Sequence, residues 1–491
     1  MPLRRVTEPF GVPVSNRARK IAVCCALLFA VSYATITLGQ SPAASSAAPR
    51  DPGVRGGSVD SGLPLASVAQ TANMLPYFED GQLRFQEIES VQNGVNNGLG
   101  PRFNSNQCSS CHSQPAVGGS SPSATAFPNI GPNPEIAVAT LDGAQNAIPS
   151  FISANGPARE ARFKFLLNSA GTALTSTPDG GVHDLFVISG RHDAGSCAIK
   201  QPNFAQNLAL NNVIFRIPTP VFGAGLIENI SEETIYANMQ ANRALKAALG
   251  ISGHPNRDGN DGMISRFGWK AQNKSLDVFG GEAYNVEMGV TNELFQNERA
   301  SPDEALAGGL PANCKLNPTP EDGTNPGATQ DTKIPSDVVA FGMFMRLLAP
   351  PTPSATNPGG ANSIAQGKAM FTAIGCAACH TPTLQTAASS ITPGLSNVNA
   401  SLYSDLLVHN MGTNLADGVS QGGAGPDEFR TAPLWGLGQR AFFLHDGRTG
   451  DLLDAILEHA SSGSEANTVV NAFRHLPAQQ QQNLLNFLRS L

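Results

Sequence analysis

Charged residues are scarce in this chain, and basic residues are not clustered. Asp, Glu, Lys and Arg together make up 14% of the 491 residues, and the formal net charge is −7. Proteins that bind nucleic acid through its phosphates usually carry a basic patch, so the composition argues against a nucleic-acid partner. The sequence also lacks a glycine-rich loop that would hold a phosphate and a recognisable Ser/His/Asp triad, so neither of these two chemistries is indicated.

A five-residue motif with two cysteines and a histidine occurs twice. The copies are Cys108-Ser109-Ser110-Cys111-His112 and Cys376-Ala377-Ala378-Cys379-His380. The C-x-x-C-H pattern is typical of haem c attachment, because two cysteines on one helical turn can add to the vinyl groups of one haem while the histidine binds its iron. A zinc site would need a second C-x-x-C or a histidine pair at short range, and neither copy has one. The sequence therefore predicts a redox protein with two covalently bound haem c groups.

The N-terminus has the pattern of an export signal. Residues 1–20 are polar and basic, and residues 21–39 form a continuous apolar run. This order is typical of a secretory signal peptide over residues 1–39, although the run is also near the length of a membrane anchor. Because bacteria attach haem c outside the cytoplasm, the haem motifs independently predict a periplasmic or otherwise exported protein.

Removal of the signal peptide, which contains Cys24 and Cys25, leaves six cysteines. Four belong to the haem motifs, and the remaining two are Cys197 and Cys314. In an oxidising compartment such a pair favours a disulfide, with two unconnected buried thiols as the alternative.

The expected fold is mainly α with long loops, organised as two cytochrome c-like haem lobes. The 50 glycines and 36 prolines predict much loop. Residues 40–70 have the Ser/Ala/Gly/Pro composition of a low-complexity tether. An N-terminal haem lobe is expected over 71–335, where the loop-rich stretch 301–335 is the crossing to a C-terminal haem lobe over 336–491.

The C-terminal lobe has the helix signals of a small cytochrome. Ser336 is a candidate cap for an apolar helix over 337–349, which is followed by two prolines. A second helix over 363–374 leads directly into the second haem motif. Pro477 opens a last helix with leucines at helical spacing, which could cover one edge of the haem.

A weak internal repeat supports duplication of the lobes. Residues 215–225 (FRIPTPVFGAG) and 429–438 (FRTAPLWGLG) share an FR pair, a proline, an aromatic residue and G-x-G. Each follows its haem motif in the same order. Arg216 and Arg430 are candidate partners of haem propionates, since a guanidinium suits a carboxylate, and structural arginines are the equal alternative.

Six segments carry a further signal: RIPTPVFGAGLIE, RFGWKAQNKSL, VEMGVT, LLVHNMG, FRTAPLWGLG and LHDGRTGDLLDAILEH. Together they resemble the bacterial di-haem oxidoreductase family, a relative of the di-haem cytochrome c peroxidases and MauG-type enzymes. The resemblance covers roughly residues 75–491 with the motifs in matching order. Activity varies across such families, and fold does not decide function.

For the second haem, with His380 as proximal ligand, the resemblance points to His459 as the sixth ligand. In the peroxidases that ligand, usually Met, follows an aromatic-His-x-Gly turn by fourteen positions, and fourteen after His445 is His459. The alternatives are a core histidine, with Met411 as a rival ligand and His409 as a weaker one. Two histidine ligands would lower the reduction potential relative to His/Met.

For the first haem, with His112 as proximal ligand, the resemblance implies the site of chemistry. The relatives place a tryptophan between the haems and a glutamate over the iron, which correspond to Trp269 and Glu287. The glutamine expected in the same pocket falls on Phe279. A core aromatic and a helix-start or surface glutamate are the alternatives for Trp269 and Glu287.

These observations predict peroxidase-like reduction of hydrogen peroxide at the first haem, with a glutamate shuttling the proton. The second haem would relay electrons from a small redox protein or cytochrome. The alternatives are a non-catalytic di-haem electron-transfer cytochrome and MauG-like oxidation or oxygenation of a partner protein or organic substrate. The resemblance also suggests Ca²⁺ between the lobes, although the acidic loop with Asp258, Asn260 and Asp261 lacks EF-hand spacing.

Overall fold

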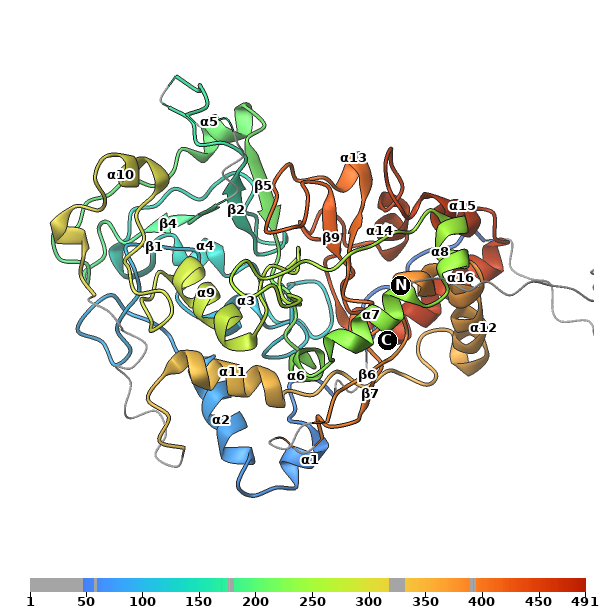
Figure 1. Ribbon diagram of the computed structural model, residues 1–491. Coiled ribbons are helices and arrows are strands. Elements are labelled where there is room, and N and C mark those ends of the chain that lie inside the picture. The colour runs from blue at the N-terminus through green and yellow to red at the C-terminus, as the bar shows by residue number, and fades with distance from the viewer. Residues whose placement is uncertain are drawn as a thin grey trace, which may run out of the picture. The chain divides into compact units, whose positions relative to one another are not determined.

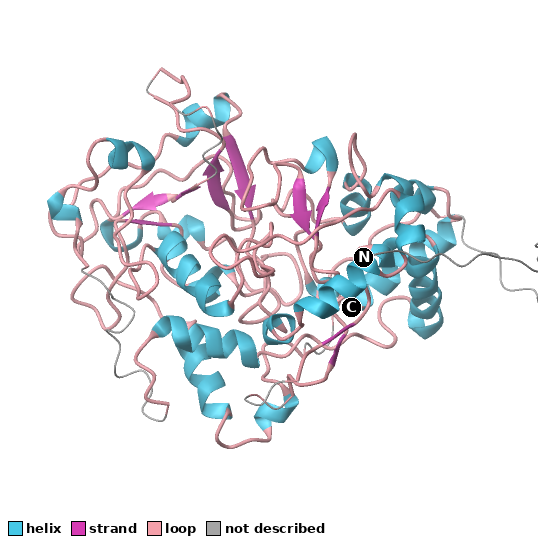
Figure 2. Ribbon diagram, in the orientation of Figure 1, coloured by secondary structure: helices cyan, strands magenta, loops and turns pink. Residues whose placement is uncertain are grey.

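In the computed structural model, short helices and long loops dominate the part of the chain that is described (Figure 2). The described residues are 47–56, 60–168, 170–174, 176, 181–317, 332–388, 392 and 394–491. The α-helices are α1 (Ala66–Ala69), α2 (Leu75–Arg84), α3 (Cys108–Cys111), α4 (Glu135–Val138), α5 (Phe204–Ala209), α6 (Ala224–Glu228), α7 (Glu232–Gln240), α8 (Arg243–Leu249), α9 (Leu276–Met288), α10 (Pro302–Leu306), α11 (Asp337–Leu347), α12 (Gly360–Ala373), α13 (Gly412–Leu415), α14 (Leu452–Glu458), α15 (Asn467–Arg474) and α16 (Ala478–Ser490). The 3₁₀ turns are η1 (Leu141–Gly143), η2 (Ala312–Cys314), η3 (Cys376–Ala378) and η4 (Leu437–Gln439). The predicted class, mainly α with long loops, is confirmed.

The strands are short and form small antiparallel sheets. They are β1 (Arg102–Phe103), β2 (Glu160–Phe163), β3 (Val182–His183), β4 (Phe186–Val187), β5 (Val213–Arg216), β6 (Leu384–Gln385), β7 (Asn399–Ala400), β8 (Val408–Asn410) and β9 (Glu428–Arg430). The three-stranded sheet has the order β3-β2-β5, and Glu160 lies opposite Arg216 in it. Because strand side chains alternate between faces, Glu160 and Arg162 point to the same side.

Helices α2, α9 and α11 pack together beside the first C-x-x-C-H motif (Figure 1). The Ser336 side chain caps α11 by accepting a hydrogen bond from the Val339 amide, as the sequence predicts. The α2–α11 contact is so close that a Cβ on Gly81 would lie 2.2 Å from the Ala340 carbonyl oxygen. The structure thus places α11 beside the N-terminal elements, whereas the sequence analysis assigned it to the C-terminal lobe. The apolar side chains of α11 pack against α2 and α9.

Helices α12 and α16 form the helical pair beside the second motif (Figure 1). Both were predicted from the sequence, and α12 leads directly into η3. Gly367 permits their contact, since a Cβ at this position would lie 1.9 Å from the Asn483 carbonyl oxygen. The closely packed pair supplies one wall of the C-terminal core, which includes Phe371 and Leu484.

The described part of the predicted tether is attached to the C-terminal elements. Asp51 accepts hydrogen bonds from Nε and a terminal nitrogen of Arg489 at 2.7 and 2.5 Å, and from the Leu452 amide at 2.8 Å. The Arg55 amide donates to the Gly438 carbonyl at 2.7 Å. Residues 47–56 therefore differ from a free linker, because a buried arginine of α16 requires the carboxylate of Asp51.

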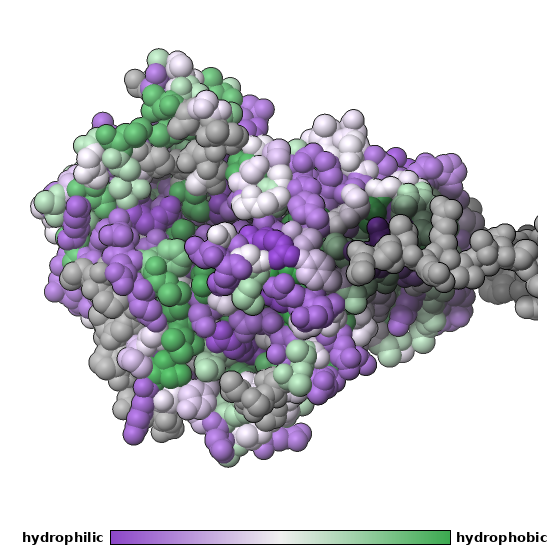
Figure 3. Space-filling view, viewed as in Figure 1, coloured by the Kyte–Doolittle hydropathy of each residue, from purple (hydrophilic) through white to green (hydrophobic). Residues whose placement is uncertain are grey.

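Among the described residues, no helix combines the length and the apolar character that crossing a membrane requires. The predicted signal peptide, including its apolar run 21–39, lies outside these residues. All described residues belong to one compact unit, Ser46–Leu491. On the face drawn in Figure 3, hydrophilic and hydrophobic residues are intermixed.

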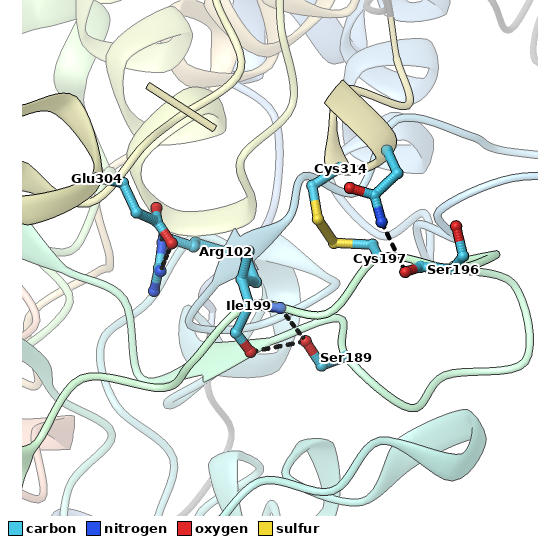
Figure 4. Close-up of a disulfide and its surroundings, with 8 residues drawn as sticks. Arg102, Ser189, Ser196, Cys197, Ile199, Glu304 and Cys314 are labelled. Atoms are coloured by element: carbon cyan, nitrogen blue, oxygen red, sulfur yellow. Dashed lines mark hydrogen bonds and ion pairs between the residues drawn. A yellow bond between two sulfur atoms is a disulfide. The ribbon is translucent and has the colours of Figure 1, made fainter. Parts of the chain in front are cut away.

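A disulfide joins Cys197 and Cys314 across 117 residues of sequence (Figure 4). This is the pair that the sequence analysis favoured. Beside it, the Asn313 side-chain amide donates to the Ser196 carbonyl at 2.7 Å, which fastens the same two segments together. The bond thus ties the loop between β4 and α5 to η2.

We expect replacement of both cysteines by serine to lower the free energy of unfolding by about 2–5 kcal/mol. The disulfide closes a long loop and so lowers the conformational entropy of the unfolded chain. Thermal unfolding of the oxidised protein and the double variant measures this. Peptide mapping without reductant should find Cys197 and Cys314 in one linked peptide, and two free thiols in native protein would contradict the assignment.

Candidate functional site

Each C-x-x-C-H motif opens onto its own cavity. The first cavity is lined by Cys108, Cys111 and His112 at the end of α3. The second is lined by Cys376, Cys379 and His380 around η3. None of the four cysteines is in a disulfide. The free thiols therefore remain available for attachment of a group inside the cavity.

The two motif histidines are oriented in the same way. His112 Nδ1 donates to the Gly119 carbonyl at 3.1 Å, and His380 Nδ1 donates to the Tyr403 carbonyl at 3.0 Å. Burial lowers the pKa of both imidazoles to about 4, so they are neutral near pH 7. A carbonyl partner on Nδ1 leaves Nε2 as the ligand atom, which is the usual arrangement of a metal-binding histidine.

Two buried guanidinium groups with few hydrogen-bond partners among the described residues line the second cavity. Arg430 donates from Nε to the Gly268 carbonyl at 3.0 Å, but one of its terminal nitrogens is buried without an acceptor. The Arg440 side chain has no hydrogen-bond partner among the described residues, and burial lowers the pKa of each arginine to about 10. Two buried cations require an anion. The propionate carboxylates of a haem would supply one, so these residues fit that group.

Arg216, the repeat partner of Arg430, is used differently. It pairs with Asp417 and donates to Gln421 at 3.1 Å, which links β5 to the 417–421 loop. Its Nε and the Nε of Arg159, which also lines the first cavity, are buried without partners. Of the two arginines singled out in the sequence, Arg216 is therefore largely committed to protein contacts.

His459 lines the second cavity together with His380. It follows α14, whose N-cap Asp451 accepts from the amides of Leu453 and Asp454. His459 Nδ1 donates to the Ala455 carbonyl at 2.6 Å, which leaves Nε2 free of a described partner. After burial and the Tyr403 hydrogen bond, the nearness of His459 is a further influence on the pKa of His380 and lowers it.

The two rival ligands of the second cavity are placed less favourably. His409 has both nitrogens engaged, with Asp405 at 3.0 Å and Glu465 at 2.7 Å. Burial opposes its charge, but Asp405 and the Cys379 sulfur, 3.7 Å from Nδ1, raise the pKa of His409 well above its ordinary value. With one carboxylate on each nitrogen, His409 has no free nitrogen to offer an iron. Met411 also lines this cavity, where it packs beside Trp269 in a small cluster with Phe429.

Trp269 lines both cavities. It is 8% exposed, and its Nε1 donates to the Ile217 carbonyl at 2.9 Å. The imidazole of His445 lies edge-on to the indole at 6.4 Å between ring centroids and stacks on Phe429 at 4.2 Å. Trp269 is thus buried, as a core aromatic would be, and also connects the two cavities.

The ammonium group of Lys270, the residue after Trp269, is buried beside Phe429. Lys270 Nζ donates to the carbonyls of Gly425 and Glu428 at 2.8 Å each, and lies 3.3 Å from an Asp417 carboxylate oxygen. It also lies 4.1 Å from the centroid of the Phe429 ring. Burial lowers the pKa of Lys270 to about 8, so the group remains charged at neutral pH.

We expect Lys270→Met to lower the free energy of unfolding by about 2–4 kcal/mol, because buried oxygens would lose their donor. Lys274→Met is the matched control, since Lys274 pairs with Asp258 and Asp261 at a more exposed site. That change should have a much smaller effect on the free energy of unfolding, because surface ion pairs contribute little. Denaturant unfolding of both variants tests this, and equal effects would contradict a special role for Lys270.

Glu287 lines the first cavity from the last turn of α9. The sequence alternatives were a helix-start or surface residue. Burial raises the pKa of Glu287 well above its ordinary value, and the charge of Glu160 raises it further. The negative end of the helix dipole acts in the same direction. Asn104 donates to the Glu287 carboxyl at 2.7 Å.

Position 279 holds Phe where the resemblance implies glutamine, but another side-chain amide lies nearby. Phe279 lines the first cavity and stacks on Phe267 at 5.9 Å. The Gln272 side chain lines the same cavity from the loop before α9. A polar amide is thus present, three residues after Trp269, although no pattern in the sequence pointed to it.

Sequence reasoning also missed Glu160 and Arg162, which line the first cavity, and Arg440, which lines the second. Arg162 Nε donates to Glu160 at 2.6 Å. The only available signal was the Glu-Ala-Arg alternation, which puts both side chains on one face of a strand. Pairing of β2 with β5, which turns that face to the cavity, depends on residues 50 to 56 positions later.

The expected Ca²⁺ stays a prediction. In the acidic loop, Lys274 Nζ lies 2.6 Å from an Asp261 oxygen and 3.7 Å from an Asp258 oxygen. These carboxylates therefore already have a cationic partner.

Comparison with known proteins identifies the family. The model of the family described as "Di-haem oxidoreductase, putative peroxidase" matches residues 167–491. A search of curated proteins gave no match. This chain belongs to the di-haem oxidoreductase family and is a haem oxidoreductase whose reaction the family leaves open.

Similar solved structures add no finer assignment. The hydrazine synthase of Kuenenia stuttgartiensis is 16% identical, with 53% of this chain and 88% of that chain covered and a TM-score of 0.25. The diheme peroxidase BthA from Burkholderia thailandensis is 15% identical over 56% and 86%, with a TM-score of 0.28. A MauG-like protein associated with microbial copper homeostasis is 13% identical over 56% and 90%, with a TM-score of 0.27. Scores this low carry no argument, so the family match alone supports the assignment.

Proposed function

We propose that this protein is an exported di-haem c-type oxidoreductase that reduces hydrogen peroxide at the first cavity and relays electrons through the second. The observation that carries the proposal is the position of Trp269, which lines both cavities. An indole shared by two redox sites shortens each electron step between them. An exposed or remote tryptophan would not support this function.

The first cavity has the groups that peroxide chemistry needs. His112 is the one imidazole among its described lining residues, so no second histidine competes for the open side of a bound iron. Cys108, Cys111 and His112 would hold a haem here, and that haem would supply the redox chemistry of peroxide reduction. Around it, Glu287 offers a carboxyl that can hold and return a proton, and Gln272 offers an amide donor.

The second cavity fits an electron relay. His380 and His459 both line it, each with Nδ1 bonded to a carbonyl, so both can present Nε2 to one iron. An iron with two strong protein ligands has no open position for substrate. Arg430 and Arg440 would neutralise the propionates of this haem.

The cell compartment and the partners follow from the same chemistry. The N-terminal signal pattern, the haem c motifs and the Cys197–Cys314 disulfide all suit the periplasm or another exported location. The electron donor is proposed to be a small redox protein or cytochrome.

We expect two haems per chain, each held by thioether bonds, at Cys108/Cys111 and at Cys376/Cys379. Acid–acetone extraction should leave the haem on the protein, and the mass of the mature chain should exceed the polypeptide by two haems. Extractable haem, or one haem per chain, would contradict this.

The ferric spectrum of the whole protein tests the proposed function. A high-spin signal that changes on adding peroxide, together with turnover supported by a reduced cytochrome, is the expected result. Two low-spin haems that are inert to peroxide in every redox state would instead indicate an electron-transfer cytochrome. Reaction with peroxide that consumes an organic or protein substrate, without turnover of the cytochrome, would indicate MauG-like oxidation.

A further inference from the structure

Two carboxyl groups touch each other in the first cavity. Glu160 on β2 and Glu287 on α9 both line it, and each lies near enough to shift the pKa of the other. Two buried carboxyl groups this close do not both ionise, so one of the two holds a proton. The pair therefore carries one proton and one negative charge.

The negative charge belongs to Glu160. Burial raises its pKa, but the charge of Arg162 more than offsets this, so the pKa of Glu160 lies below its ordinary value. Arg162 Nε donates to Glu160 at 2.6 Å from the same face of β2. Arg216, opposite Glu160 in the sheet, adds a second positive charge.

The proton belongs to Glu287. Among the described residues its carboxyl has no ion pair with a cation, and the polar contact from Asn104 at 2.7 Å is that of a neutral amide. Burial, then the charge of Glu160, and then that of Asp184 all raise the pKa of Glu287. Asp184 is itself 3.4 Å from Arg299, which also donates to the Val286 carbonyl at 2.8 Å.

Other charged or titratable side chains near the pair are already engaged. The Cys108 and Cys111 thiols face Glu287 from α3, and in the haem-bound protein they would be thioethers. Glu282, on the same helix and in the same cavity, accepts a hydrogen bond from Asn273. The proton is therefore confined to Glu160 and Glu287.

We propose that Glu160 and Glu287 act as one carboxyl pair that shares a proton, with Glu287 facing the reacting oxygens and Glu160 as the positioning residue that stores the proton. This inference rests on the proposed peroxide chemistry. A protonated Glu287 alone could donate a proton but could not first accept one. The pair can do both, because Glu287 passes its proton to Glu160 while it takes another from the substrate.

The protons and electrons of this reaction balance. The overall reaction is H2O2 + 2 H⁺ + 2 e⁻ → 2 H2O. The near oxygen gives its proton to the pair, the pair returns it to the far oxygen, and the O–O bonding electrons leave with the far oxygen as the first water. Two electrons from the protein electron donor and two protons from solvent release the near oxygen as the second water.

The test is a pH titration of the carboxylic-acid C=O band by infrared spectroscopy on the haem-loaded protein. Subtracting the spectrum of Glu287→Gln isolates the Glu287 band from that of Glu135, whose pKa burial raises to about 8. Glu160→Gln should lower the midpoint of the Glu287 band by about one to two pH units, since a neighbouring charge is removed. Glu282→Gln, which removes a charge from the same cavity, should leave the midpoint in place, and Glu160→Asp should keep it near the wild-type value.

The same variants are then mixed with peroxide across the pH range. Glu160→Gln should slow peroxide cleavage by about 10-fold or more and change its pH profile, with haem content unchanged. An unmoved infrared midpoint, or a moved midpoint with a wild-type rate and pH profile, would overturn the shared-proton relay. Wild-type protein that is inert to peroxide while the midpoint still moves would overturn the proposed function and the relay, but not the shared proton.

Discussion

His459→Ala should convert the second haem from a low-spin to a high-spin ferric state. The change removes an imidazole that lines the cavity with His380. Of the other histidines there, His409 has both nitrogens on carboxylates, and His445 stacks on Phe429 beside Trp269. Loss of one of two strong ligands leaves a five-coordinate or water-bound iron. Electron paramagnetic resonance and visible absorption of the ferric protein measure the result directly.

Methionine at the same position provides the matched comparison. His459→Met should keep the second haem low-spin and raise its reduction potential by roughly 0.1–0.3 V, a part of the ~0.8 V that axial ligands span. Met411→Ala serves as the control, because Met411 packs beside Trp269 rather than on α14. If Met411→Ala produces the high-spin state and His459→Ala does not, the ligand assignment is wrong.

Glu287→Gln should slow peroxide cleavage by about 10²–10⁴-fold, the usual contribution of a positioned proton-transfer group. Glutamine keeps the size and the contact with Asn104, so haem content and the resting spectrum should stay nearly unchanged. Stopped-flow mixing of the reduced or resting protein with peroxide gives the rate.

Trp269→Phe separates proton transfer from electron transfer. This variant should bind and cleave peroxide at nearly the wild-type rate but slow the delivery of electrons from the second cavity, because the indole shared by both cavities is lost. Equal effects of Glu287→Gln and Trp269→Phe on the cleavage step would show that the two residues do not have distinct roles.

Local chemistry explains which features the sequence could predict. The haem motifs, the cap at Ser336 and helices α12 and α16 depend on residues that are close in the chain, and the structure contains each of them. The Cys197–Cys314 pair could also be predicted, because these are the two cysteines left after the signal peptide and the haem motifs are counted. His459 was reached through the family resemblance, which implies a ligand fourteen residues after His445, and the structure brings it to the cavity of His380.

Features that depend on distant partners were missed or placed differently. Helix α11 packs on α2 rather than with the second haem motif, and residues 47–56 are fixed by Arg489, more than 400 positions away. The roles of Arg216 and Arg430 differ because their partners lie far away in the sequence. The two arginines lie in similar motifs, but only Arg216 forms an ion pair with Asp417.

The sequence by itself determined that this protein carries two haem-attachment motifs, a pattern for export and the helices that frame the second motif, because each of these is written in neighbouring residues. Only the tertiary structure decided what surrounds the two cavities. Contact between Glu160 and Glu287, the Lys270 ammonium and the position of Trp269 on both cavities each join segments that are far apart in the chain. Burial then changes the chemistry of those groups, since a carboxyl or ammonium removed from water takes its protonation state from the few partners that the fold provides.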